Sequence, residues 1–140
     1  MSGFRIFTID TNYQFRDKRK IEAWVIAAIK EYKKNPGEIN IILCNDDYLH
    51  QINVDYLQHD DYTDIITFDN CEGNVVNGEL YISLERVKEN AKSFSSGLRN
   101  EIHRVIIHGV LHLLGHKDKS KSEKAKIRLE EDRLLHLRAF

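Results

Sequence analysis

The segment HGVLHLLGHKD, residues 108–118, places metal-binding residue types within an otherwise apolar stretch. His108 and His112 are four residues apart, so on a helix both imidazoles project from the same face. A buried imidazole without a partner carries a desolvation cost, and two rings remove that cost together if they share a cation. Zinc accepts neutral imidazole nitrogens at about 2.0–2.1 Å, so the spacing favours a zinc clamp.

A catalytic zinc also needs a third protein ligand and an open position. Gly115 predicts the end of the helix and a reversal of the backbone. Asp118 follows three residues later and has the reach to return over the imidazoles, so we prefer it to His116 as the third ligand. The pattern thus predicts one Zn²⁺ per chain, held by His108, His112 and Asp118. The competing interpretation is a pair of core histidines that bind no metal.

Gly109 narrows the chemistry that such a zinc could perform. In peptidases with the pattern His-Glu-x-x-His, the glutamate beside the first histidine is the general base. Glycine here weakens the peptidase hypothesis and leaves hydrolysis of a phosphodiester, because zinc activates water near pH 7 and polarises phosphoryl oxygens. No catalytic group beyond that water is indicated. Several basic residues flank the segment and either attract an anionic substrate or form a solvated surface: Arg99, Arg104, Lys117, Lys119 and Lys121.

The totals indicate one ordinary domain, residues 1–140, with a formal net charge of -1. This balance gives no sign of broad nucleic-acid binding, so such a role must rest on a local site. No apolar run could span a bilayer and no signal peptide is evident, so we expect a cytoplasmic protein without a membrane partner. The oligomeric state is not indicated. The remaining histidines have no comparable company and are interpreted as surface or core residues: His50, His59, His103 and His136.

The elements that must position these residues follow from hydrophobic periodicity. Strands are expected at 4–9, 38–45, 63–69 and 78–84, and helices at 17–34, 46–57, 85–94, 96–115 and 120–140. Asp17 is a candidate cap for the first helix, and Pro36 is interpreted as a helix stop followed by a turn. We therefore predict a single α+β domain, with about five helices on a mixed sheet of about four strands. The helix at 96–115 is apolar nearly all round, so it should be the central, metal-binding helix.

Three segments together resemble the YbeY family of metal-dependent endoribonucleases. HGVLHLLGHKD is similar to the family's His-Gly-x-Leu-His-Leu-x-Gly-Tyr-Asp-His. NVDYLQHDDYTDIITF (53–68) is similar to the segment that ends in Thr-Asp-Val-Leu-Ser-Phe, and GELYIS (78–83) to Gly-Asp-Ile-x-Ile-Ser. The resemblance covers most of the chain from about Ile39 onward, which makes it far more specific than one short motif.

The resemblance implies a zinc-dependent endoribonuclease that matures the 3′ end of the small-subunit (16S) ribosomal RNA and supports ribosome quality control. Ribosomal RNA and the small ribosomal subunit would be its partners. His108 and His112 match the first two ligands, Asp118 matches the third histidine, and His116 matches the tyrosine. Leu57 departs from the pattern, because the family usually has an arginine there that is thought to assist with the RNA phosphate. Either another cation, such as Arg104 or Lys117, replaces it, or the protein is a ribosome assembly factor with a structural metal and weak or no catalysis.

Overall fold

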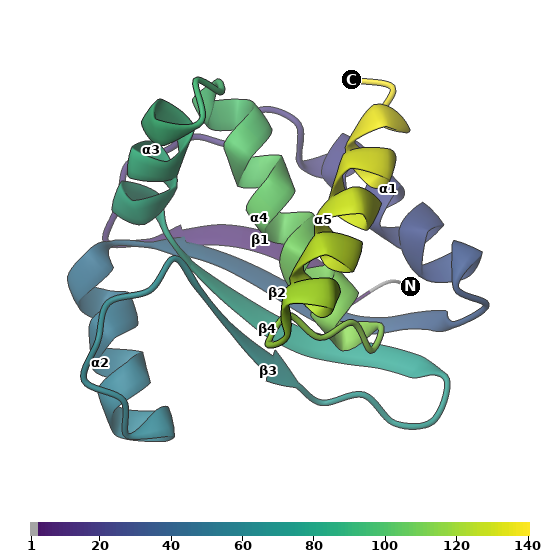
Figure 1. Ribbon diagram of the computed structural model, residues 1–140, viewed down its shortest axis with the longest axis horizontal. Helices are drawn as coiled ribbons and strands as arrows, with labels where there is room; N and C mark the ends of the chain where they lie inside the picture. Colours follow the sequence, from purple (N-terminus) through teal and green to yellow (C-terminus); the bar gives the residue numbers. More distant parts are fainter. Residues whose placement is uncertain (1–2) are drawn as a thin grey trace.

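The computed structural model describes residues 3–140 as four strands and five helices in one α+β domain. The strands are β1 (Gly3–Ile9), β2 (Asn35–Cys44), β3 (Ile65–Asp69) and β4 (Val75–Ser83). The helices are α1 (Lys18–Glu31), α2 (Asp46–Leu57), α3 (Leu84–Ser93), α4 (Leu98–Leu113) and α5 (Lys121–His136). Figure 1 shows the sheet with α4 lying across it. The predicted fold class is confirmed, including the central position of α4.

The strand order in the sheet is β1-β2-β4-β3. β2 pairs in parallel with both β1 and β4, and β3 pairs antiparallel with β4, so the sheet is mixed as expected. β2 lies between β1 and β4, and Ile41, Leu43 and Cys44 in its second half are fully buried. A near-continuous apolar run of this kind is typical of a parallel strand that is covered on both faces.

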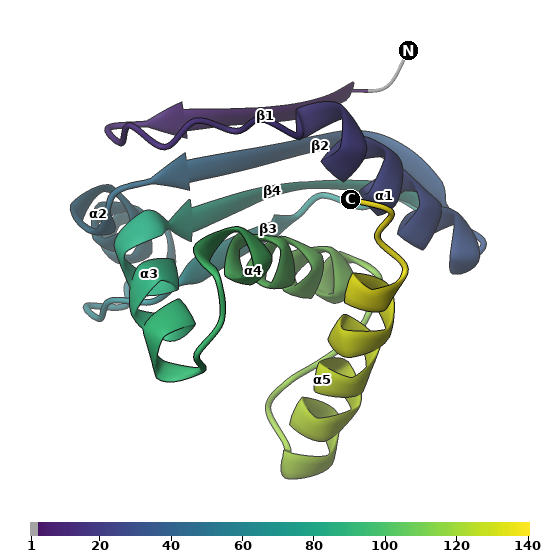
Figure 2. The same ribbon diagram turned by 90° about the horizontal axis from the view of Figure 1, so that it is seen from above.

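The helices cover the two faces of the sheet unequally. The main core joins α1, α3, α4 and α5 to one face through side chains such as Ile41 and Leu80. On the opposite face a smaller cluster, formed by Cys44, Leu49, Ile52 and Ile66, anchors α2. Figure 2 shows α3 and the N-terminal half of α5 extending away from the sheet on the same side, with α4 between them. α4 thus lies between two helices that extend away from the sheet.

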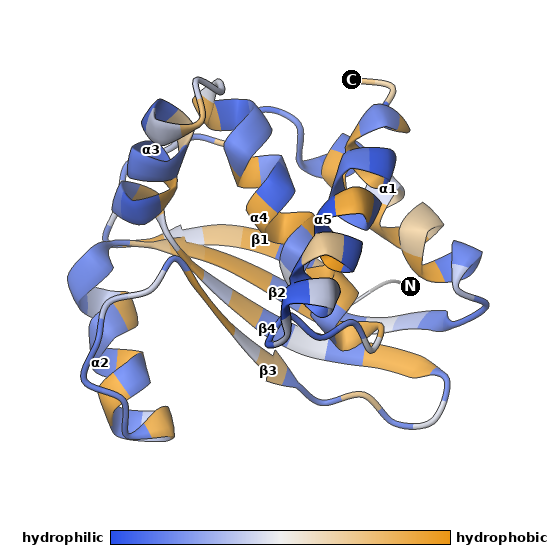
Figure 3. Cartoon of the chain, viewed as in Figure 1, coloured by the Kyte–Doolittle hydropathy of each residue, from blue (hydrophilic) through white to orange (hydrophobic). Residues whose placement is uncertain are grey.

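Gly109 faces the sheet at a point where α4 leaves no room for a larger side chain. A Cβ at this position would meet Leu80 Cδ2 at 2.8 Å and Ile65 Cδ1 at 2.9 Å, both tighter than ordinary packing permits. The apolar surface of the helix continues into the apolar strands beneath it (Figure 3). Glu101, Arg104 and His108 of α4 therefore line the side that faces α3 and α5, whereas His103 is buried against Asp17 and Trp24.

Several local expectations were wrong. Pro36 belongs to β2, where it pairs with Val76 just before a register shift, because this end of the strand tolerates a residue without an N–H. Asp17 is the N-cap residue of α1, as expected, but its side chain makes no capping hydrogen bond, since its carboxylate accepts from Arg99 and His103 instead. α5 ends at His136 rather than at residue 140, and Leu137, just beyond its end, is 56% exposed. In residues 3–140, no helix has both the length and the apolarity to cross a membrane.

Candidate metal centre

The structure brings His108, His112 and Asp118 together as a group that could hold a metal ion. The two histidine Nε2 atoms are 3.0 Å apart. Asp118 Oδ2 lies 3.3 Å from each of them. For ligand atoms at zinc distances of about 2.0–2.1 Å, the edge of a tetrahedron is about 3.3 Å. The three spacings therefore match three corners of a tetrahedral site, with one corner left for another ligand.

Hydrogen bonds fix which nitrogen of each ring faces the group. His112 Nδ1 lies 2.9 Å from the backbone oxygen of His116, and His108 Nδ1 lies 2.6 Å from Glu131 Oε2. Both partners are acceptors, so each Nδ1 must carry the proton and donate. In the neutral rings both Nε2 atoms then present bare lone pairs. This outer hydrogen bonding is characteristic of histidines that bind metals.

The convergence of three electron-rich atoms is a test of whether a cation fits. With both rings neutral, the two unprotonated Nε2 atoms and the carboxylate oxygen repel one another. A divalent cation satisfies all three at once, and nitrogen and carboxylate oxygen are both accepted zinc donors. The residues present therefore fit the metal that the sequence predicts.

Gly115 delivers the third residue by ending α4 in a defined way. Its φ of 105° lies in the left-handed region that favours glycine. The N–H of Gly115 donates to the oxygen of His112, and the N–H of His116 donates to that of Leu111, a Schellman pair. The chain then reverses, which places the His116 carbonyl at His112 Nδ1 and allows Asp118 to reach both rings.

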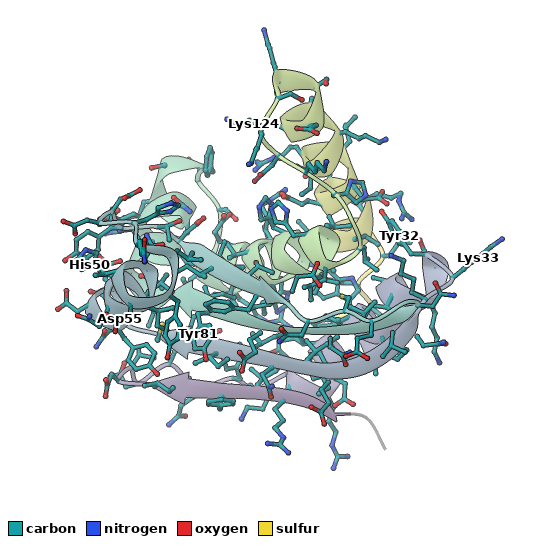
Figure 4. All side chains as sticks on the ribbon, turned by 90° about the horizontal axis from the view of Figure 1, so that it is seen from below. Tyr32, Lys33, His50, Asp55, Tyr81 and Lys124 are labelled. Carbon is teal, nitrogen blue, oxygen red and sulfur yellow. The ribbon has the colours of Figure 1, made fainter. Side chains whose placement is uncertain are left out.

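His116, the alternative third ligand, turns away from the group. Its Nε2 lies 2.8 Å from the hydroxyl of Tyr32, at the end of α1 (Figure 4). Since the Tyr32 hydroxyl donates to Glu130, the ring nitrogen of His116 donates to the hydroxyl. Burial lowers the pKa of His116, so its ring is neutral at pH 7. His116 therefore secures the loop through its side chain and orients His112 through its backbone.

Glu131, on α5, links the histidine group to Arg104. Its carboxylate accepts from His108 on one oxygen and from Arg104 Nη1, at 2.9 Å, on the other. The second guanidinium nitrogen, Nη2, donates to Asp132. Burial disfavours the charged form of His108, but the hydrogen bond and charge of Glu131, with Asp118, outweigh it and raise the pKa of His108. Arg104 is thus engaged by two carboxylates and is not a free cation in place of the missing arginine.

Sequence reasoning missed Glu131, although one signal was present. Glu131 is only 4% exposed and lies four residues after Ile127 on the buried face of α5. A carboxylate at a core position of an amphipathic helix requires a buried partner. That pattern could have indicated a role for Glu131, but the partner itself, His108, comes from a different helix.

A cleft of about 270 Å³ opens beside His108 and Asp118, between α3, α4 and α5. α4 contributes Glu101, Arg104, Val105 and His108, and α5 contributes Lys124, Ile127, Arg128 and Glu131. Both sets have the spacing i, i+3, i+4, i+7, which is one face of a helix. Asn90 and Phe94 from α3, together with Asp64 before β3, complete the lining.

The structure also shows where Gly109 and Leu57, two positions that the sequence analysis discussed, lie relative to the cleft. Gly109 faces Leu80 and Ile65 in the sheet, so the position of the peptidase glutamate is packed against apolar side chains. Leu57 ends α2 and does not line the cleft, and neither does Lys117. The cations that do line it besides Arg104 are Lys124 and Arg128, which sequence reasoning did not single out. Burial raises the pKa of Glu101 on the cleft floor.

Comparison with known proteins identifies the family. The family model described as endoribonuclease YbeY matches residues 7–138. The chain belongs to the YbeY family. Curated YbeY endoribonucleases include one from Cytophaga hutchinsonii, 47% identical over 96% of this chain and 94% of its own length. Another, from Flavobacterium johnsoniae, is 44% identical over 90% of this chain and 91% of its own length.

A solved structure extends the similarity to three dimensions. The solution structure of TM1509 from Thermotoga maritima superposes with a TM-score of 0.66 at 26% identity. It covers 95% of this chain and 89% of its own. The sequence resemblance to the YbeY family is therefore confirmed over nearly the whole chain. The family assignment also gives the metal group and its cleft a functional context, since the relatives carry the name endoribonuclease.

Proposed function

We propose that this protein is a zinc-dependent endoribonuclease that cleaves single-stranded RNA at the His108–His112–Asp118 centre. The observation that carries the proposal is the convergence of His108 Nε2, His112 Nε2 and an Asp118 oxygen beside an open cleft. Membership of the YbeY family supports RNA as the substrate. Three protein donors leave one position for water or substrate, as expected for a catalytic zinc site.

A zinc ion bound there supplies Lewis-acid polarisation of a phosphoryl oxygen and activates water for attack near neutral pH. The protein's own residues hold the donors ready. Glu131 and the His116 carbonyl keep the Nδ1 protons in place, so both imidazoles offer Nε2 without a tautomer change. Arg104 compensates the buried charge of Glu131. Asp118 makes the centre more negative by one charge than a third histidine would, which should strengthen its hold on the cation.

The finer proposal follows the family. We infer that the domain, residues 1–140, works in the cytoplasm on ribosomal RNA at the small ribosomal subunit, maturing the 3′ end of the 16S RNA and supporting ribosome quality control. The two other hypotheses receive less support. A structural zinc is usually closed by four protein ligands, and the group formed within residues 3–140 has three. A peptidase would need a general base where Gly109 packs against the sheet.

The test compares purified wild type with His108→Ala and His112→Ala. Wild type should contain one zinc per chain by elemental analysis and should cleave single-stranded RNA, and both variants should lose metal and cleavage together. Cleavage at the wild-type rate by both variants would show a contaminating nuclease and refute the proposal. Cobalt substitution separates a catalytic from a structural ion, since a spectrum typical of a fully protein-coordinated site would favour the assembly-factor hypothesis.

A further inference from the structure

The outer part of the cleft carries an aromatic ring and two cations whose arrangement the metal centre does not explain. Phe94, at the end of α3, is 60% exposed. The Arg128 guanidinium carbon lies 5.5 Å from the centre of this ring, across the cleft from α3 to α5. Lys124 is one turn before Arg128 and lies on the side of α5 that faces α3 (Figure 4).

The two cations differ from the other positive side chains near the centre. Arg104 and Arg133 each bind carboxylates at 2.6–2.9 Å. Arg128 and Lys124 make no such ion pair with any residue in 3–140, although both line a cleft that also contains Glu101 and Asp118. Unpaired cations on a cleft wall remain available to an anionic ligand.

The position of these groups relative to the metal centre follows from the helical spacing of α5. Arg128 is three residues before Glu131, which contacts His108, and Lys124 is one turn nearer the N-terminus of the helix, which extends away from the sheet (Figure 2). The ring, the guanidinium and the ammonium therefore lie on the same cleft as the metal group, displaced from it toward solvent. A strand that reaches the metal centre through this cleft would pass these groups.

We propose that Phe94 and Arg128 form a stacking platform for one nucleobase of a single-stranded RNA, and that Lys124 binds an adjacent backbone phosphate. The inference rests on the proposed function, since it takes RNA as the substrate. Exposed aromatic rings next to cations are how proteins hold single strands without reading their sequence, because every base has a stacking face and every linkage a charge. Such a platform strengthens binding of the strand beside the metal centre.

Stacking and charge make separable contributions, which gives a direct test. The probe is a nuclease-resistant single-stranded RNA of about ten nucleotides, within the usual range of site sizes, with 2-aminopurine at one position. With the full-length, zinc-loaded protein, Phe94→Ala should weaken binding by about tenfold and abolish the quenching of 2-aminopurine. Phe94→Trp should retain both. Because no charge is altered, the dependence of log Kd on log salt should be the same as in the wild type.

Lys124→Ala should act in the opposite way. It should reduce the salt slope by about 0.7, the value for one phosphate contact on a single strand, and leave the quenching intact. Matched controls come from parts of the molecule outside the cleft. Phe7, 40% exposed on the edge strand β1, and Lys30, exposed on α1, should give wild-type binding when changed to Ala. With cleavable RNA, Phe94→Ala should raise KM about tenfold at nearly unchanged kcat.

The outcomes distinguish this inference from the proposed function. Wild-type affinity and quenching in Phe94→Ala would refute the platform even if the enzyme cleaves RNA normally. Phe94-dependent quenching by a protein that never cleaves RNA would instead refute the proposed function and leave the platform standing. Zinc content equal to wild type, and an unchanged circular dichroism melt, would show that the variants act through the cleft rather than through folding.

Discussion

α4 carries two histidine–carboxylate arrangements five residues apart, and they have opposite chemical outcomes. His103 is 1% exposed, with Nε2 3.0 Å from Asp17 and Nδ1 2.7 Å from an Arg138 nitrogen. Arginine only donates, so Nδ1 accepts and Nε2 donates, and both ring nitrogens are satisfied by the protein. His108 is satisfied on Nδ1 alone, and its Nε2 faces His112 and Asp118.

The difference shows that neither burial nor a carboxylate partner marks a metal ligand. Burial, with the charge of Arg138, lowers the pKa of His103 to about 4 against the opposing effect of Asp17. At His108 the carboxylates outweigh burial and raise the pKa. What distinguishes the metal centre is a set of lone pairs without protons that converge on one point. His103 therefore stabilises the fold, and His108 is a candidate metal ligand.

The strongest way to break this comparison is to truncate each ring. His103→Ala should lower the free energy of unfolding by about 3–5 kcal/mol. The substitution leaves a cavity and removes the imidazole that donates to the largely buried carboxylate of Asp17. The folded fraction should still bind one zinc. His108→Ala should change the stability of chelator-treated protein by only about 1 kcal/mol and abolish zinc binding. Urea unfolding and elemental analysis measure both, and a large loss of stability in the second variant alone would reverse our assignment.

Acid unfolding provides the next largest effect. The pKa of His103 is about 4 in the folded protein and 6.5 when unperturbed, so the unfolded chain takes up the proton first. Stability therefore falls as the pH drops from 6.5 to 4, by about 3 kcal/mol, and is insensitive to this group above that window. Chelator-treated wild type should show this slope in urea midpoints. His103→Gln should flatten it, and an equal slope in that variant would assign the acid sensitivity to another group.

A substitution at Glu131 tests the metal centre through a residue that contacts a ligand without being one. Glu131→Gln should weaken zinc affinity by about 10–100-fold, because the amide orients His108 less firmly and no longer neutralises Arg104. Competition against a chromophoric chelator measures the affinity. Glu89→Gln makes the same chemical change on the exposed surface of α3, where the side chain is 71% exposed, and should leave the affinity unaltered. Equal affinities in the two variants would show that the contact between His108 and Glu131 does not support the centre.

The predictable and unpredictable parts of the site differ in sequence separation. Two histidines one helical turn apart, a glycine and an aspartate lie within eleven residues, so local backbone geometry alone brings His108, His112 and Asp118 together. Alternating and helical apolar patterns were likewise enough to place all nine elements in residues 3–140. The partners that complete the centre come from other helices, as with Glu131 from α5 and Tyr32 from α1. Their contacts depend on how the helices cross, which spacing along one segment does not contain.

The errors have the same origin. Asp17 has the residue type and position of a helix cap, yet its carboxylate is taken by Arg99 and His103 across the fold. Proline usually marks the end of a helix, which is why Pro36 was interpreted as a helix stop. In the structure Pro36 pairs with Val76 and belongs to strand β2. In each case a tertiary contact replaced the local preference on which the prediction depended. The exposed cleft residues Phe94 and Arg128 were overlooked for a related reason, because the contact between them joins α3 to α5 across the cleft.

The smallest effect should come from Tyr32, which reaches the centre through two intermediaries. Its hydroxyl holds His116, whose carbonyl accepts from His112 Nδ1. Burial, with the hydrogen bond to Glu130, raises the pKa of Tyr32, so the phenol keeps its proton at working pH. Tyr32→Phe should remove about 1 kcal/mol from the free energy of unfolding and weaken zinc binding about fivefold, with the ligands themselves intact. Tyr62→Phe, which removes an exposed hydroxyl 3.4 Å from Asp47, is the matched control. If Tyr32→Phe lowered stability but left zinc affinity equal to the control, the turn at Gly115 alone would orient His112. The hydrogen bond between Tyr32 and His116 would then stabilise the fold, as His103 does, without supporting the metal centre.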